Sequence, residues 1–205
     1  MASNDSVLGA DVSRETIEKL RAFAALLEKW TKSINLIAPK SVPDIWERHI
    51  LDSAQLFTLA PENWVSWTDL GSGGGLPAVV ISIMDQQQRP ITLVESDQRK
   101  CLFLKTVRRE LSLNMTVEHS RIETATVAPS SILTARALAP LADLLAFSES
   151  SLSPNGTALF AKGENYKTEL DVAQKNWQFD LSLHQSLTNQ DARILEISRI
   201  RRRES

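Results

Sequence analysis

The sequence predicts an α/β fold: a seven-stranded, largely parallel sheet with helices on both faces and a helical segment ahead of it. From about residue 64 onward, short apolar runs alternate with amphipathic stretches of helical period, and the connections are short. That alternation is typical of a doubly wound parallel sheet. Before residue 64, only helical periodicity is found. The last two strand candidates are too close for a helix between them, so we expect an antiparallel hairpin at the sheet edge.

The first 63 residues are expected to form a helical segment that packs on the core of a domain spanning residues 64–205, within one globular unit. Ser13 is a predicted N-cap, and apolar residues follow it at helical spacing: Ile17, Leu20, Phe23, Ala24, Leu27 and Trp30. A second helix is predicted to start at Ser41 as its cap, with Pro43 in its first turn, and to end before Pro61.

The alternating part of the chain supplies all strands of the predicted sheet. Strands are predicted at 65–70, 91–95, 115–119, 131–136, 156–162, 178–185 and 193–200. Helices are predicted at 76–85, 98–112, 140–151 and 165–175.

Composition narrows the range of functions. The formal net charge of −2 argues against a uniformly basic nucleic-acid coat. Cys101 is the single cysteine and the three histidines are far apart in sequence, so we expect neither a disulfide nor a metal site. Residues 1–9 are polar and no apolar run approaches the ~18 residues of a membrane span, so a cytoplasmic protein without membrane contact is expected.

A glycine-rich loop joins the first predicted strand to the following helix. It reads Asp69-x-Gly71-x-Gly73-x-Gly75 and ends in Leu76. Glycines at alternate positions let a ligand lie directly against the backbone. Leu76 stands where the dinucleotide fingerprint has its third glycine, and no Gly-Lys-Ser/Thr follows, so both the strict dinucleotide pattern and a P-loop fail.

Two acids at strand ends indicate which nucleotide the loop holds. Asp69 precedes the glycines and suits a ligand with a cationic head, as in S-adenosylmethionine. Glu95 ends the next strand, where a carboxylate can accept hydrogen bonds from both ribose hydroxyls. Alternatively, Asp69 only caps the next helix, but that leaves the glycine run and Glu95 unexplained.

The later strand ends hold further candidates. After the third strand, Ile122 could cover an adenine face and Glu123 could read its edge, although Glu123 alone is more typical of an acid at a helix start. Arg136 ends the fourth strand, where the transferable methyl is expected, and could hold a substrate phosphate or base, or form a salt bridge. Lys162 ends the fifth strand and is a similar, weaker case.

The chain resembles the glucose-inhibited division protein B family, bacterial methyltransferases that act on guanine N7 in small-subunit ribosomal RNA. The resemblance covers nearly the whole chain. Its most specific part is a box ahead of the glycine loop, Arg48-His49-Ile50-Leu51-Asp52-Ser53. The other matching segments are Asn35-Leu36, residues 69–77, Ser120-Arg121-Ile122-Glu123, Arg136-Ala137 and residues 159–163.

The resemblance implies a seven-stranded, Rossmann-like methyltransferase sheet and transfer from S-adenosylmethionine to guanine 527 of 16S ribosomal RNA. It assigns cofactor contacts to the matching positions Gly71, Leu76, Ile122, Glu123 and Arg136. The chain departs from the family at two positions. Gly74 stands where Pro or Ala is usual and is expected to loosen the loop slightly. Ala78 replaces a Gly and adds a methyl at the loop–helix contact.

RNA contacts are expected at Asn35, Arg48, His49 and Lys162. Asn35 could equally serve turn geometry, and His49 could be a partly buried, hydrogen-bonded histidine. The expected partner is small-subunit ribosomal RNA, within a 30S subunit or an assembly intermediate, bound by a monomer. Two other functions remain open: methylation of a small molecule or protein, which would not need the Arg48–Ser53 box, and a non-catalytic nucleotide-binding module.

Overall fold

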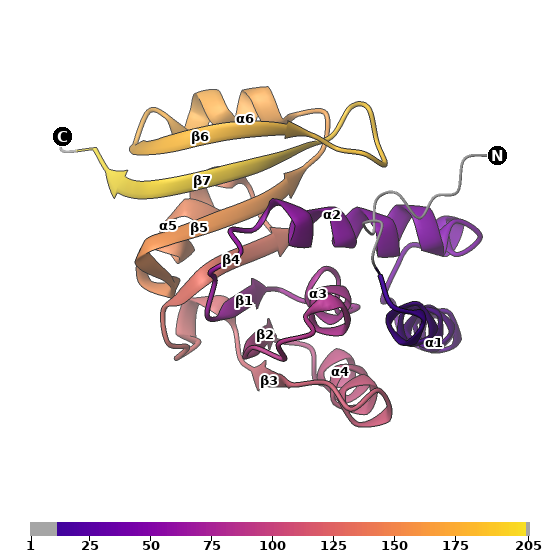
Figure 1. Ribbon diagram of the computed structural model, residues 1–205. Coiled ribbons are helices and arrows are strands. Elements are labelled where there is room, and N and C mark those ends of the chain that lie inside the picture. The colour runs from indigo at the N-terminus through magenta and orange to yellow at the C-terminus, as the bar shows by residue number, and fades with distance from the viewer. Residues whose placement is uncertain (1–11, 204–205) are drawn as a thin grey trace.

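The computed structural model describes residues 12–203; the polar stretch at residues 1–9 lies outside them. One seven-stranded sheet crosses the molecule in the order β3-β2-β1-β4-β5-β7-β6 (Figure 1). The strands are β1 (Trp67–Leu70), β2 (Ile91–Glu95), β3 (Met115–His119), β4 (Ser130–Arg136), β5 (Leu152–Lys162), β6 (Trp177–Gln185) and β7 (Arg193–Arg202). Every predicted strand is present, and the fifth begins four residues earlier than expected.

The helices alternate with the strands as the sequence predicts. The α-helices are α1 (Arg14–Thr31), α2 (Asp52–Leu59), α3 (Ala78–Met84), α4 (Gln98–Glu110), α5 (Leu141–Ser151) and α6 (Tyr166–Ala173). Short 3₁₀ turns occur at η2 (Pro39–Ser41) and η4 (Ile122–Thr124), and η3 (Trp46–Leu51) is a π-helix. Ser13 caps α1 as predicted, because its side chain accepts a hydrogen bond from the Thr16 N–H.

The order of the strands explains where the ligand loops gather. Strands β1 to β5 pair in parallel, so their carboxyl ends meet at one edge of the sheet. The terminal hairpin is antiparallel, as predicted, and β7 inserts between β5 and β6. Its turn therefore lies at the same edge as the end of β5.

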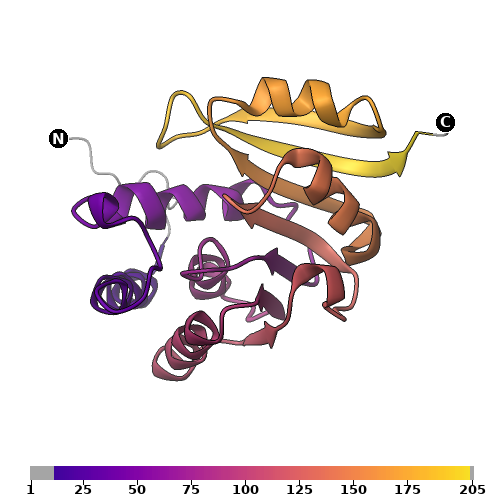
Figure 2. The same ribbon diagram turned by 180° about the vertical axis from the view of Figure 1, so that it is seen from behind.

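Alternating side chains of the central strands build two separate cores. On β1, Trp67 faces one core and Leu70 the other; on β4, Ile132 and Leu133 divide in the same way. Helices α1 to α4 cover the first face, and α5 and α6 cover the second. Figures 1 and 2 show α1, α3 and α4 together on one side and α5 on the other.

The N-terminal helical segment shares its core with the sheet domain. Leu20, Phe23 and Leu27 of α1 are fully buried and belong to the same apolar cluster as Phe103 of α4. Gly74 lies beneath this segment, because a Cβ there would stand 3.1 Å from Leu27 Cδ1. The N-terminal segment and the sheet domain thus share one apolar cluster. The division of the chain at residue 63 stays a prediction.

The predicted second helix differs from the observed one. Ser41 does not cap it: the residue lies inside η2, and its hydroxyl donates a hydrogen bond to the Ala38 carbonyl at 2.8 Å. The chain enters a π-helix at Trp46 and becomes α-helical at Asp52. Apolar spacing did not show this, because π-helices are rare and a single turn holds too few apolar residues to define its period.

Within residues 12–203, no helix has both the length and the apolar character needed to cross a membrane. The same residues include no group of three histidine, cysteine, aspartate or glutamate side chains arranged to hold a metal ion.

Candidate functional site

The glycine loop between β1 and α3 uses its glycines for backbone geometry. Gly71, Gly73 and Gly75 all have positive φ, at +64°, +54° and +80°. Other L-residues rarely adopt such values. At Gly75 a Cβ would also stand 2.5 Å from Val79 Cγ2, so both the backbone conformation and the packing exclude a side chain there. The alternation Gly-x-Gly-x-Gly therefore fits a backbone that must turn tightly and stay bare.

Glu95 fastens this loop to the neighbouring strand. Its Oε2 accepts a hydrogen bond from the Gly73 N–H at 2.8 Å, and its Oε1 accepts from the N–H groups of Ser96 and Asp97, each at 2.8 Å. The side chain is 7% exposed. Glu95 therefore holds the loop, a role that the spacing did not suggest, and its contact with a ribose stays a prediction.

Asp69 is buried with one carboxylate oxygen unsatisfied. Its side chain is 1% exposed. Oδ1 accepts a hydrogen bond from Thr134 Oγ1 at 2.7 Å, whereas Oδ2 is buried without a hydrogen-bond partner among the described residues. Burial raises the pKa of Asp69 to about 6, against the lowering effect of the Thr134 hydrogen bond. A buried carboxylate with a vacant acceptor is suited to a donor supplied by a ligand.

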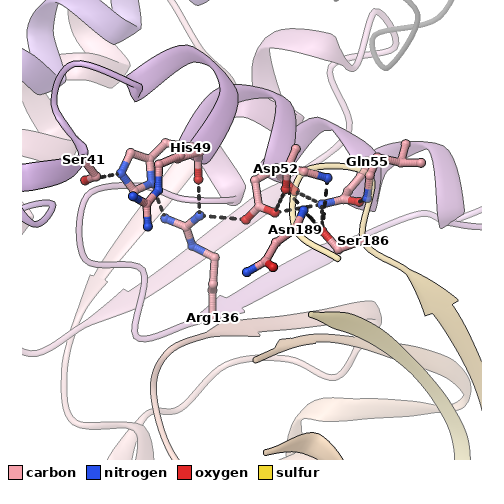
Figure 3. A network of polar contacts seen from close by, with 10 residues as sticks. Ser41, His49, Asp52, Gln55, Arg136, Ser186 and Asn189 are labelled. Carbon is pink, nitrogen blue, oxygen red and sulfur yellow. Dashed lines mark hydrogen bonds and ion pairs between the residues drawn. The ribbon is translucent and has the colours of Figure 1, made fainter. Parts of the chain in front are cut away.

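Arg136, at the end of β4, is held by the Arg48–Ser53 box. Its Nη1 pairs with Asp52 Oδ2 at 3.0 Å and approaches the Arg48 carbonyl at 3.4 Å. Its Nη2 lies 3.0 Å from His49 Nδ1. Figure 3 shows the guanidinium reaching from the strand up between His49 and Asp52. The salt-bridge alternative for Arg136 is therefore the one present in this structure.

His49 has its tautomer set by its two hydrogen-bond partners, Arg136 and Ser41. Because a guanidinium only donates hydrogen bonds, Nδ1 must accept from Arg136, and the proton of the neutral ring then sits on Nε2. Nε2 lies 2.8 Å from Ser41 Oγ, and the Ser41 hydroxyl donates onward to Ala38 O. Burial, and then the nearby Arg136 charge, lower the pKa of His49 to about 4, so the ring is neutral at pH 7.

Asp52 carries the same network to the C-terminal hairpin. Its Oδ1 accepts hydrogen bonds from Gln55 Nε2 at 2.9 Å and from Thr188 Oγ1 at 2.6 Å. Gln55 is 2% exposed, and its Oε1 accepts from the Leu187 N–H at 2.9 Å. Gln55 Nε2 also approaches Ser186 Oγ at 3.4 Å. One polar network therefore joins η3, α2, β4 and the β6–β7 turn.

The π-helix presents the box to Arg136. In an α-helix the Asp52 N–H would bond to the Arg48 carbonyl four residues earlier. Here the Asp52 N–H bonds instead to Glu47 O and His49 O. The Arg48 carbonyl accepts from Arg136. Single π-turns inside helices are frequent at functional sites.

A cleft of about 1050 Å³ opens beside this network, at the carboxyl ends of β4 and β5. Three predicted residues line it, namely Arg48, Arg136 and Lys162, together with Asp52, Gln55 and the turn residues Ser186, Thr188 and Asn189. Leu138 also lines it, and a Cβ on Gly71 would lie 2.5 Å from Leu138 Cδ1. Through Leu138, the cleft adjoins the glycine loop.

The other predicted site residues lie outside the hydrogen-bond network around Arg136. Lys162 Nζ pairs with Glu169 Oε2 and donates to Ala139 O, both at 2.7 Å. Ile122 and Glu123 lie in η4 after β3, half-buried and exposed respectively. Asn35 is exposed in the bend between α1 and η2, away from the cleft lining.

Sequence reasoning did not single out Asp52, Gln55 or Thr188 as functional residues. Asp52 had a signal, because it belongs to the box that carried the family resemblance. Thr188 had none, since a threonine in a polar turn is ordinary. Its partner Asp52 is 136 residues away in sequence, and only the fold brings the two together.

Solved structures with this fold include several methyltransferases. The TM-score to a ribosomal protein L11 methylase from Lactobacillus delbrueckii is 0.58, with 16% identity, covering 74% of this chain and 78% of that one. For an Aeropyrum pernix fibrillarin solved with natively bound S-adenosyl-L-methionine it is 0.53, with 18% identity, covering 64% and 65% of the two chains. At these identities the likeness establishes the fold.

Curated relatives are much more similar in sequence. A protein named Ribosomal RNA small subunit methyltransferase G from Ruegeria sp. strain TM1040 is 47% identical over 205 residues, which is 98% of this chain and all of that protein. A protein of the same name from Paracoccus denitrificans is 49% identical, covering 93% of this chain and 98% of its own length. The family model GidB, described as rRNA small subunit methyltransferase G, matches residues 16–197. The chain therefore belongs to the GidB family of small-subunit ribosomal RNA methyltransferases.

Proposed function

We propose that the chain transfers a methyl group from S-adenosylmethionine to N7 of guanine 527 in 16S ribosomal RNA. The observation that carries this is the junction at Leu138, where a bare glycine loop with an unsatisfied buried carboxylate adjoins a cleft lined by Arg136. Membership of the family supplies the reaction class and the RNA substrate. The choice of guanine 527 and of its N7 atom rests on the resemblance.

The residues of the glycine loop fit the cofactor. The vacant Oδ2 of Asp69 suits its cationic amino-acid end, and the positive-φ glycines give it access to the backbone. Glu95 is proposed to accept a hydrogen bond from one ribose hydroxyl, with the Oε2 lone pair that remains after its three backbone hydrogen bonds. Leu76, Ile122, Glu123 and Arg136 are proposed as further contacts on the resemblance.

The bound cofactor supplies an electrophilic methyl group. Guanine N7 carries an in-plane lone pair and no proton, so the chain need not supply a general base. Its own contribution is to hold the base still, and positioning alone can contribute roughly 7–11 kcal/mol to lowering a barrier. Arg136 is proposed as the residue that fixes the acceptor, with Arg48 and Lys162 along the same cleft.

The substrate is proposed to be a folded 30S subunit or an assembly intermediate, bound by one copy of the chain. A cleft that mixes basic residues with Asp52 and Glu169, on a chain of net charge −2, is poorly suited to hold extended RNA by bulk charge. Recognition of shape in a structured ribonucleoprotein fits better. Such an enzyme works where small subunits are assembled, in the cytoplasm.

The test is methylation of small subunits purified from cells that lack this modification. We expect methyl-labelled S-adenosylmethionine to label 16S RNA at one guanine, located by nuclease digestion and mass spectrometry. Label on the assembled subunit but not on naked RNA supports the proposed substrate. Cofactor binding with no transfer to either form of RNA would favour the small-molecule, protein or non-catalytic alternatives.

A further inference from the structure

An ion pair with Arg136 needs only Asp52, yet the Arg48–Ser53 box also places the His49 ring and the Arg48 carbonyl against the same guanidinium. We propose that His49 is a positioning residue for Arg136: with Ser41 behind it, the imidazole fixes the guanidinium in one orientation on the wall of the acceptor cleft. This inference rests on the proposed function, because it assigns the box to the methyl-acceptor side of that reaction.

The direction of the hydrogen bonds supports this role. Arg136 can only donate, so the chain runs from its Nη2 to His49 Nδ1, from His49 Nε2 to Ser41 Oγ, and from the Ser41 hydroxyl to Ala38 O. His49 and Ser41 each use their one side-chain donor, and no other direction satisfies both of them. A ring held at both nitrogens cannot rotate or flip without losing a bond.

The guanidinium is bound on some of its donors and open on others. Its three contacts within residues 12–203 are Asp52 Oδ2, the Arg48 carbonyl and His49 Nδ1, and they use both protons of Nη1 and one of Nη2. The Nε proton and the second Nη2 proton have no acceptor there. The side chain is 19% exposed and lines the cleft, so these two donors are available to acceptor atoms of RNA.

Asp52 alone would not fix this orientation. A single-oxygen ion pair restrains the position of a guanidinium but leaves it free to pivot about that contact. His49 supplies the second point, on the opposite nitrogen, and Figure 3 shows the two partners on either side of Arg136. Ser41 is 3% exposed and anchors the ring to the η2 turn, so the restraint is transmitted to the N-terminal segment.

The experiment compares His49→Phe and His49→Asn in single-turnover methylation of undermodified small subunits at saturating cofactor. Phe fills the space of the ring without an acceptor, whereas the Asn amide oxygen lies near the place of Nδ1. We expect His49→Phe to slow methyl transfer about 10- to 100-fold, the range for one hydrogen bond to a charged group. We expect His49→Asn to restore most of the rate.

His184→Phe is the matched control, because the His184 ring also makes a side-chain hydrogen bond, to Glu196, but lies on the β6–β7 hairpin and has no hydrogen bond to Arg136 among the described residues. Its rate should equal that of the wild type. Imidazole ¹⁵N spectra of the full chain at pH 7 give a readout independent of activity: His49 should be the neutral Nε2–H tautomer, and Ser41→Ala should loosen that preference.

Wild-type transfer by a folded His49→Phe variant would overturn the inference, as would a rate for His49→Asn no better than for His49→Phe. An Nδ1–H or doubly protonated ring at pH 7 would overturn it as well. If His49→Phe does not fold, His49→Asn and Ser41→Ala carry the same test. An inactive wild type with intact cofactor binding contradicts the proposed function itself, which separates the two failures.

Discussion

Two charged side chains, Asp69 and Arg136, lie toward the ends of the neighbouring strands β1 and β4, and they differ in how far the protein itself supplies their hydrogen-bond partners. Asp69 is buried with a vacant oxygen, and its pKa is raised to about 6. Arg136 is met by a carboxylate, an imidazole and a carbonyl, all from the same short box. Asp69 thus has a buried acceptor, Oδ2, with no hydrogen-bond partner among the described residues. The Arg136 guanidinium, in contrast, is held on both of its terminal nitrogens by the protein itself.

This difference suits the two proposed roles: Asp69 binds a ligand, and Arg136 orients the methyl acceptor. An unsatisfied buried carboxylate costs stability in the free protein, and a cationic ligand recovers that cost on binding. A guanidinium that must orient an acceptor is more useful when it is already fixed, because little freedom is then lost in the complex.

Asp69→Asn should weaken cofactor binding and stabilise the free protein. Removing one partner of a buried ion pair costs ~3–5 kcal/mol, so affinity should fall about 100-fold or more by calorimetry. The pKa rise from 3.8 to about 6 corresponds to roughly 3 kcal/mol of strain in the ionised state, which the neutral amide removes. A higher Tm is expected without cofactor. Unchanged affinity would mean that the vacant oxygen is not the ligand's partner.

Gly75→Ala should destabilise the loop far more than Gly73→Ala. At Gly75 a methyl would combine φ +80° with contacts of 2.5 Å to Val79 and 3.0 Å to Leu104. We expect a loss of about 2–5 kcal/mol in urea unfolding, the sum of left-handed strain and overpacking. At Gly73 the nearest atom is 3.8 Å away, leaving only the strain of about 1–2 kcal/mol. Equal losses would contradict the packing argument.

Asp52→Ala tests whether the contacts around Arg136 stabilise the folded protein. It leaves Arg136 without its carboxylate and takes an acceptor from Gln55 and Thr188. Because the ion pair is about one-fifth exposed, we expect a loss of about 1–3 kcal/mol in the free energy of unfolding. Asp44→Ala, on the same cleft wall, should change it by under ~0.5 kcal/mol. A loss no larger for Asp52 than for Asp44 would show that the network adds no stability.

Asp69 and His49 should respond to pH with opposite sign. The folded chain binds a proton at Asp69 between about pH 6 and 4, before the unfolded chain does, so the stabilisation by Asp69→Asn should shrink as the pH falls. At His49 the unfolded chain is protonated first, between 6.5 and about 4, so wild type should lose stability relative to His49→Asn over that window. Each slope is at most ~1.4 kcal/mol per pH unit. If the stability differences for Asp69→Asn and His49→Asn change in the same direction as the pH falls, the two groups do not titrate in opposite senses.

The sequence was sufficient for the sheet because its signals are local. The ranges predicted for β2 and β3 match the structure at both ends, and the short gap before β7 correctly indicates an antiparallel hairpin. The link between Glu95 and the glycine loop was also within reach, since acids at adjacent parallel strand ends must lie close together.

The network around Arg136 was out of reach for a different reason. Its geometry depends on a π-turn, which the apolar spacing of this segment does not reveal, and on contacts between residues more than 80 positions apart. Sequence spacing placed Arg136 at the right strand end but left open whether its partner was RNA or a carboxylate. Only the fold shows that the box and the strand end are one structure.

The hydrogen bond between Gln55 and the Leu187 N–H joins two parts of the chain that are synthesised far apart in time. As the chain is synthesised, every residue of the glycine loop emerges more than 100 residues before the turn at Ser186. A chain released before that turn contains Asp69 and Glu95 but lacks one wall of the acceptor cleft. The residues from this turn onward thus decide whether a chain that already contains its glycine loop also has a complete cleft beside it.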